Sequence, residues 1–379
     1  MNEKEILNTM ILAKLPHLTL ANARQLYDKM ESATAVLDNW ESIPDFSNIA
    51  PKKLKEIFSN VDNMRTVAEQ EMEFVSKNGI KPLCLASDDY PHRLRQCPDA
   101  PLVLFHLGNA NLNASKIVSI IGTRKCSQQG REICDAFVSQ LKEHHPNTLI
   151  VSGLAYGIDI NAHRAALKQG MPTIGVLAHG LDRIYPAIHR ATAVEMLEQG
   201  GLLTEYTSGT NPDRGNFVRR NRIVAGMADA TIVVESARKG GSMITAELTN
   251  TYGRELFAFP GRISDESFLG CNNLIKSHKA QMIETAEDFL KAMNWEIKPK
   301  AGEAQQQELF LHLSEDETTV YNALKSADDK HINQIATDTS LPVYLASGVL
   351  YELECKGLVS AIGGGRYKLN SLGDKVKLS

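Results

Sequence analysis

"FVRRNRIVAGMADATIVVESARKGGS", residues 217–242, joins a basic segment, an apolar run and a glycine-rich turn. The apolar run, Ala230–Glu235, predicts a strand buried on both faces, which is typical of a parallel sheet. The turn after it precedes a helical pattern, and the amides that begin a helix can face an anion. The stretch therefore predicts a parallel α/β sheet with an anion site at a strand end.

Six further apolar runs around this stretch alternate with helical patterns. Strand, glycine turn and helix in repetition predict a doubly wound, extended Rossmann-like parallel sheet over residues 81–296. Ligands of such sheets bind outside the carboxyl ends of the strands, where the glycine turns lie. The six runs are Ile117–Ile121, Thr148–Ser152, Thr173–Ala178, Gly201–Glu205, Glu255–Phe259 and Ala280–Ile283.

Both flanks of this region differ from it in pattern. Residues 1–80 have helical spacing and predict a small helical domain, resembling a SAM or helix-hairpin-helix domain. It has no Gly-x-Gly hairpin, so packing or a protein contact is favoured over DNA binding. Residues 297–312 are polar and predict a linker. Residues 313–379 predict a winged-helix domain whose third helix, near Val343–Cys355, carries glutamates and no basic residue. Glutamates repel phosphate, so a protein contact is again favoured over DNA.

Composition excludes several classes of protein. The 379 residues carry a formal net charge of −4, so any binding of nucleic acid must come from a local patch. The six cysteines form no Cys-x-x-Cys pair, which argues against a zinc ribbon and against a disulfide framework. The sequence shows neither a signal peptide nor an apolar run long enough for a membrane helix. We therefore expect a cytoplasmic protein without a membrane segment, a metal or a cofactor.

Five loops at predicted strand ends carry the candidate chemistry. "IIGTRKCSQQG" (120–130) lacks the motifs of a dinucleotide site and of a P-loop. In "VSGLAYGIDINAHRAAL" (151–167), a helix-capping role for Asp159 is favoured over acid–base chemistry with His163. In the stretch quoted first, a spacing of three puts Arg219 and Arg222 on one helical face, with Arg220 pointing elsewhere. Each loop alone is a weak signal, but together they predict a site for a long polyanion.

The ordered motifs GTR, SGLAYGID, FVRRNRI, KGGSMITAE, FPG and GCNNLI resemble the DNA-processing protein A family, also called Smf or DprA. The resemblance covers about residues 80–290. It implies a cytoplasmic bacterial protein that binds single-stranded DNA and loads the RecA recombinase during natural transformation. It also implies a homodimer and no catalysis. Three departures from the family pattern are Val218 in place of proline, Tyr156 in place of a frequent arginine, and His278 and Lys279 before Ala280, where the family tends to have Gly-Ala.

The loops and the resemblance together give the candidate DNA-binding residues. The resemblance gives Arg220 more weight than the helical-face argument does. For Phe217, a place in the core is favoured over stacking on a base. The candidates are Gly122, Thr123, Arg124, Lys125, Ser152, Gly153, Gly157, Phe217, Arg219, Arg220, Asn221, Arg222, Lys239, Gly240, Gly241, Ser242, Asn272, Asn273 and Lys276.

The alternative function is enzymatic. Phosphoribohydrolases of the lysine-decarboxylase-like group share this type of fold and use a Gly-Gly-x-Gly-Thr-x-x-Glu turn. Gly240, Gly241 and Glu247 fit that motif, but Met243 and Ile244 stand where it has glycine and threonine. In this alternative, Glu247 lies beside the sugar of a nucleoside monophosphate.

Overall fold

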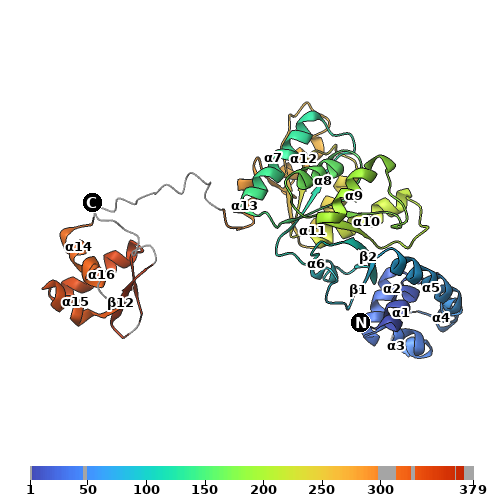
Figure 1. Ribbon diagram of the computed structural model, residues 1–379, viewed down its shortest axis with the longest axis horizontal. Helices are drawn as coiled ribbons and strands as arrows, with labels where there is room; N and C mark the ends of the chain where they lie inside the picture. Colours follow the sequence, from blue (N-terminus) through green and yellow to red (C-terminus); the bar gives the residue numbers. More distant parts are fainter. Residues whose placement is uncertain (1, 46–48, 298–312, 326–328, 363, 371–379) are drawn as a thin grey trace. The chain divides into compact units, whose positions relative to one another are not determined.

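The computed structural model describes residues 2–45, 49–297, 313–325, 329–362 and 364–370. It divides into two units, residues 1–298 and 299–379 (Figure 1). Most of the predicted linker, residues 298–312, lies outside the described residues.

In the first unit, the described residues form a nine-stranded sheet with the order β1-β2-β6-β5-β4-β3-β7-β8-β9. Strands β3 to β9 run parallel, and β2 pairs antiparallel with β1 and with β6. The strands are β1 (Lys81–Cys84), β2 (Val103–Gly108), β3 (Ile117–Ile121), β4 (Leu149–Ser152), β5 (Thr173–Val176), β6 (Gly201–Thr204), β7 (Ala230–Val233), β8 (Glu255–Ala258) and β9 (Gln281–Met282). The predicted large, mostly parallel α/β sheet is confirmed, and the antiparallel pair β1 and β2 is an addition to it.

Helices cover both faces of the sheet, because alternate residues of each buried strand point to opposite sides. Ile117 and Ile121 of β3 join the core that includes the helices of one face, whereas Val118 and Ile120 join the core of the other. The helices after β2 are α7 (Gln128–His144), α8 (Ile158–Lys168), α9 (Arg190–Gln199), α10 (Arg214–Met227), α11 (Gly241–Thr251), α12 (Leu269–Lys276) and α13 (Ala286–Ala292), with a 3₁₀ turn, η2 (Ala187–His189).

The helices before β1 share a core with the sheet. Met10 and Val75 belong to the same buried cluster as Leu104 of β2 and Val224 of α10. A break at residues 59–60 divides the helical pattern of residues 51–79 into two helices. The helices are α1 (Glu3–Lys14), α2 (Leu20–Met30), α3 (Ala33–Asp38), the 3₁₀ helix η1 (Trp40–Asp45), α4 (Pro51–Phe58) and α5 (Val61–Lys77), with the short α6 (His92–Arg95) between β1 and β2.

The described residues of the second unit form three helices and a three-stranded antiparallel sheet of order β10-β12-β11. Its core includes Tyr321 of the first helix, Ile335 of the second and Leu350 of the third. The elements are α14 (Glu315–Lys325), β10 (Lys330–His331), α15 (Ile332–Thr339), α16 (Val343–Cys355), β11 (Val359–Ala361) and β12 (Arg366–Leu369). In neither unit does the described chain include a helix with the length and apolar character needed to span a membrane.

Candidate functional site

A cleft of about 1020 Å³ opens at the carboxyl ends of β3 and β7. These neighbouring strands are the switch point of the sheet, because the chain leaves β3 toward β4 on one side and leaves β7 toward β8 on the other. Diverging loops at such a point leave room for a ligand. The loops after β3, β4 and β7 line the cleft, together with one side of α10.

Close backbone contacts fix the first two loops. The amide of Thr123 donates to the carbonyl oxygen of Glu235 at 2.7 Å, which ties the loop after β3 to that after β7. Gly157 has φ +78°, and a Cβ there would collide with the carbonyl oxygen of Thr123. Glycine is required at this position by both its conformation and its surroundings.

Arg220 lies at the floor of the cleft and is only 3% exposed. Its Nη1 donates to the carbonyl oxygens of Gly153, at 2.7 Å, and Val176. A Cβ on Gly153 would lie 2.5 Å from both Arg220 Nη2 and Asp159 Oδ2, so the guanidinium and the carboxylate flank the same glycine. The helical-face prediction set Arg220 apart from Arg219 and Arg222 but favoured the wrong face: the side of α10 that lines the cleft carries Phe217, Arg220, Asn221 and Val224.

Asp159 also lines the cleft. The prediction that it caps the helix is wrong. The N-cap of α8 is Gly157, and Asp159 lies in the first turn. Burial raises the pKa of the Asp159 carboxyl, and the charge of Arg220 partly offsets that rise. His163 is fully buried against Thr173 Oγ1 at 2.7 Å, and burial lowers its pKa to about 3. Its imidazole is thus neutral at physiological pH.

Arg222 does not line the cleft. Its Nη2 lies 2.6 Å from Glu205 Oε2, and its side chain is only 10% exposed. The two residues Arg220 and Arg222 lie about 200° apart around a helix, so they reach different surroundings. The structure therefore places Arg222 in a buried ion pair instead of among the cationic groups of the cleft.

The loop after β7 lines the cleft next to the loop that carries Arg124. Lys239 and Gly240 are exposed there, and α11 begins at Gly241. Asn221 Nδ2 donates to the carbonyl oxygen of Gly241 at 3.3 Å, and the hydroxyls of Ser236 and Ser242 are 2.8 Å apart. The first contact holds the start of α11 against α10 and the second holds it against the loop after β7, and the first turn of α11 lines the cleft.

Phe217 lines the cleft, so the prediction that it fills the core is wrong. It is partly exposed, and the Arg124 guanidinium lies over its ring at 5.0 Å. Counted over the described residues, the lining has five cationic side chains and two carboxylates, a formal balance of +3. They are Arg124, Arg214, Arg220, Arg238, Lys239, Asp159 and Asp213.

Several predicted residues lie elsewhere. Ser152 is buried in the sheet, where its hydroxyl donates to the carbonyl oxygen of Ile120. Asn272 bonds to both the amide and the carbonyl of Gly261, which is a structural role. Lys125, Arg219, Asn273 and Lys276 do not line the cleft.

The sequence reasoning missed Tyr185, Arg214 and Arg238, which do line the cleft. Arg238 could have been predicted, because it is a basic residue directly before the candidate Lys239. Tyr185 lies five residues beyond Gly180 in the loop after β5, and it carries no charge that would have marked it.

Glu247, the acid of the enzymatic alternative, gives that alternative no support. Its side chain is exposed, pairs with Lys279 at 2.8 Å and does not line the cleft. Within the described chain, no group of three or more His, Cys, Asp and Glu residues is arranged to hold a metal ion.

Comparisons with known proteins agree with this architecture. The profile of a family described as DNA recombination-mediator protein A matches residues 81–294. Protein Smf of Synechocystis is 31% identical over 92% of this chain and 94% of its own. The X-ray structure of DNA processing protein A from Streptococcus pneumoniae aligns with a TM-score of 0.60 and 31% identity, covering 77% of this chain and 99% of that one. DNA processing protein A from Helicobacter pylori, whose structure is described as showing a unique single-stranded DNA-binding mode, aligns with a TM-score of 0.51 and 30% identity over 57% and 95% of the two chains.

Proposed function

Because this chain belongs to the DNA recombination-mediator protein A family, we propose that its cationic cleft binds the phosphates of single-stranded DNA. The proposal rests on one observation: a single cleft is lined by Arg124, Arg220, Lys239 and the first turn of α11. Helix-start amides and arginine side chains are the donors that suit phosphate oxygens. Such contacts read the backbone and carry no sequence information.

The partners belong to the same proposal. We infer a homodimer that loads the RecA recombinase onto the bound strand during natural transformation, in the cytoplasm and without catalysis. The family supports these inferences, and Glu247, the acid of the enzymatic alternative, does not line the cleft.

The domain assignments are proposals as well. Three helices followed by β11 and β12 support a winged-helix domain in residues 313–379, joined by a linker at 297–312. The exposed Glu352 and Glu354 of α16 favour a protein contact there. Residues 1–80 would be the helical domain and residues 81–296 the Rossmann-like DNA-binding domain.

Removing one exposed cationic side chain of the cleft should weaken binding without affecting the fold. For Arg124→Ala and for Lys239→Ala, we expect roughly ten- to a hundred-fold lower affinity, because each variant lacks a charge-assisted bond to phosphate. The slope of log affinity against log salt should flatten by roughly 0.7 for each phosphate that is no longer neutralised. Titration of a fluorescent oligonucleotide at several salt concentrations measures both quantities.

Arg219→Ala is the matched control, because Arg219 is an exposed cation that does not line the cleft. It should keep the affinity and the salt slope of the wild type. If Arg219→Ala weakened binding as much as Arg124→Ala, a diffuse basic surface and not this cleft would hold the strand.

The assembly can be checked on the free protein. We expect sedimentation at micromolar concentration to give about twice the chain mass of 41.8 kDa. A strict monomer, both free and with DNA, would contradict the proposed homodimer.

A further inference from the structure

Two exposed tyrosines lie at the rim of the cleft and take no part in the phosphate site described above. Tyr156 is 47% exposed and Tyr185 is 45% exposed. A tyrosine ring left in water at a binding site is available for stacking, which requires an apolar face. Each of the two rings contacts a second aromatic ring.

Tyr185 lines the cleft beside Phe217. The two ring centroids are 5.8 Å apart with a tilt of 55°, and both residues line the cleft. The guanidinium of Arg124 lies over Phe217, so a cation adjoins this pair of rings. A phosphate held by Arg124 would therefore leave its nucleoside close to Phe217 and Tyr185.

Tyr156 lies beside the same opening. Its neighbour Ala155 lines the cleft, and its other neighbour, Gly157, is packed against the backbone of Arg124. The ring of Tyr156 meets the ring of His189 edge to face at 5.1 Å. Tyr185 and His189 are the two ends of one short segment, so this segment contacts Phe217 at one end and Tyr156 at the other. We call these four residues, Phe217, Tyr185, His189 and Tyr156, the aromatic band.

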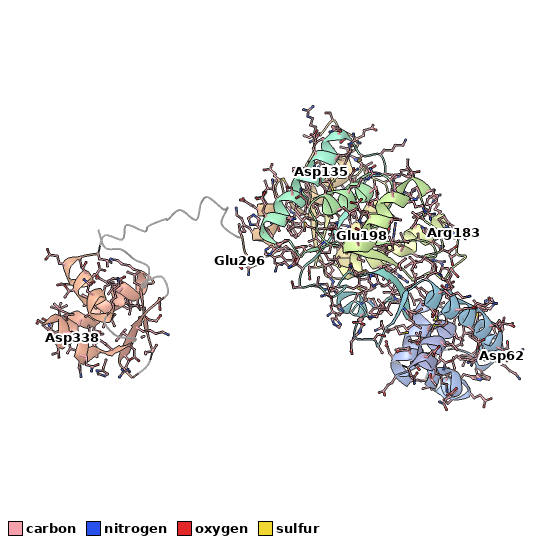
Figure 2. All side chains as sticks on the ribbon, viewed as in Figure 1. Asp62, Asp135, Arg183, Glu198, Glu296 and Asp338 are labelled. Carbon is pink, nitrogen blue, oxygen red and sulfur yellow. The ribbon has the colours of Figure 1, made fainter. Side chains whose placement is uncertain are left out.

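Hydrogen bonds to buried groups hold the segment in place. The amide of Tyr185 donates to Nε2 of the buried His179 at 3.2 Å, and Nδ1 of His189 donates to the carbonyl oxygen of Leu154 at 2.9 Å. Arg183, on the same loop, lies at the outer edge of the first unit (Figure 2). These bonds fix the backbone of Tyr185 and the ring of His189 before any ligand arrives, which reduces the entropy lost on binding.

We propose that the aromatic band binds the bases of the strand whose phosphates occupy the cleft, with Tyr185 and Tyr156 each stacking on one base. The proposal rests on the proposed function, since it needs a strand in the cleft. Two features favour bases as the occupant: the band continues a cationic cleft, and base–aromatic stacking beside a positive groove is how single strands are bound without sequence preference. Duplex DNA would be excluded from the band, because its bases are paired and stacked on one another.

The test uses the full-length protein with two single strands of equal length. One is an oligothymidylate, and the other has the same backbone with abasic sites throughout. We expect Tyr185→Ala and Tyr156→Ala each to lower affinity for the normal strand by about 5- to 150-fold. Affinity for the abasic strand and the salt slope on both strands should stay at the wild-type values, because every phosphate-binding cation is kept. Tyr185→Phe and Tyr156→Phe should restore binding, because the ring is kept.

Val194→Ala is the control for loss of an exposed apolar side chain. Val194 is 56% exposed on α9 and does not line the cleft, so binding should not change. Alanine variants that bind the normal strand like the wild type would overturn the aromatic band, as would an equal loss on normal and abasic strands. Failure of the wild type to bind either strand is a different result, because it would refute the proposed function itself.

Discussion

Replacing Arg220 with alanine is expected to lower the free energy of unfolding by about 3–5 kcal/mol and to remove most binding of single-stranded DNA. The stability falls because Gly153 and Val176 lose a buried donor and Asp159 loses the neighbouring positive charge. Binding falls because the guanidinium is a buried cation at the floor of the cleft. Urea unfolding and oligonucleotide titration of the same sample measure the two effects.

The pH dependence of the Arg220→Ala variant supplies a second check. Burial raises the pKa of Asp159 in the folded protein, so the folded state holds its proton to a higher pH than the unfolded state does. Stability therefore falls as pH rises from about 4, the ordinary carboxyl pKa, through the raised value. Arg220 lowers that pKa, so its loss should steepen and extend the fall. An unchanged pH profile would show that the two groups do not interact.

Replacing Arg222 with alanine should have a different effect: a loss of about 3–5 kcal/mol in stability with unchanged affinity and salt slope for the folded protein. Arg222 pairs with Glu205 away from the cleft, and removing one partner leaves a buried carboxylate uncompensated. Glu205 Oε1 already lacks a hydrogen-bond partner in the structure. Urea unfolding and a salt-dependent titration separate this variant from Arg220→Ala.

The double variant Arg222→Met with Glu205→Leu is the control for the ion pair. Apolar residues of similar size often replace such a pair at little cost, so stability should return toward the wild-type value. A lower salt slope for Arg222→Ala would show instead that Arg222 reaches a phosphate.

The sequence by itself determined the parallel part of the sheet and the edge at which its glycine turns lie. Mostly apolar runs such as Ile117–Ile121 and Ala230–Val233 have few alternatives to a buried parallel strand, because both of their faces must be covered. The glycine turns after these strands then had to meet at one edge. Strands β1 and β2 were missed because they pair antiparallel at the border of the sheet, where no repeated strand–turn–helix unit marks them.

Only the tertiary structure decided which side chains of those loops share the cleft. The sequence does not distinguish the three arginines of α10 from one another. In the structure, Arg219 is exposed, Arg220 lies on the floor of the cleft and Arg222 pairs with Glu205. That outcome depends on where α10 begins and on which carboxylates distant segments bring beside it. The same holds for Tyr185, whose ring joins the cleft only because its loop folds back onto Phe217. Local pattern fixes strands and turns, whereas the surroundings of a charged or aromatic side chain come from residues far away in the chain.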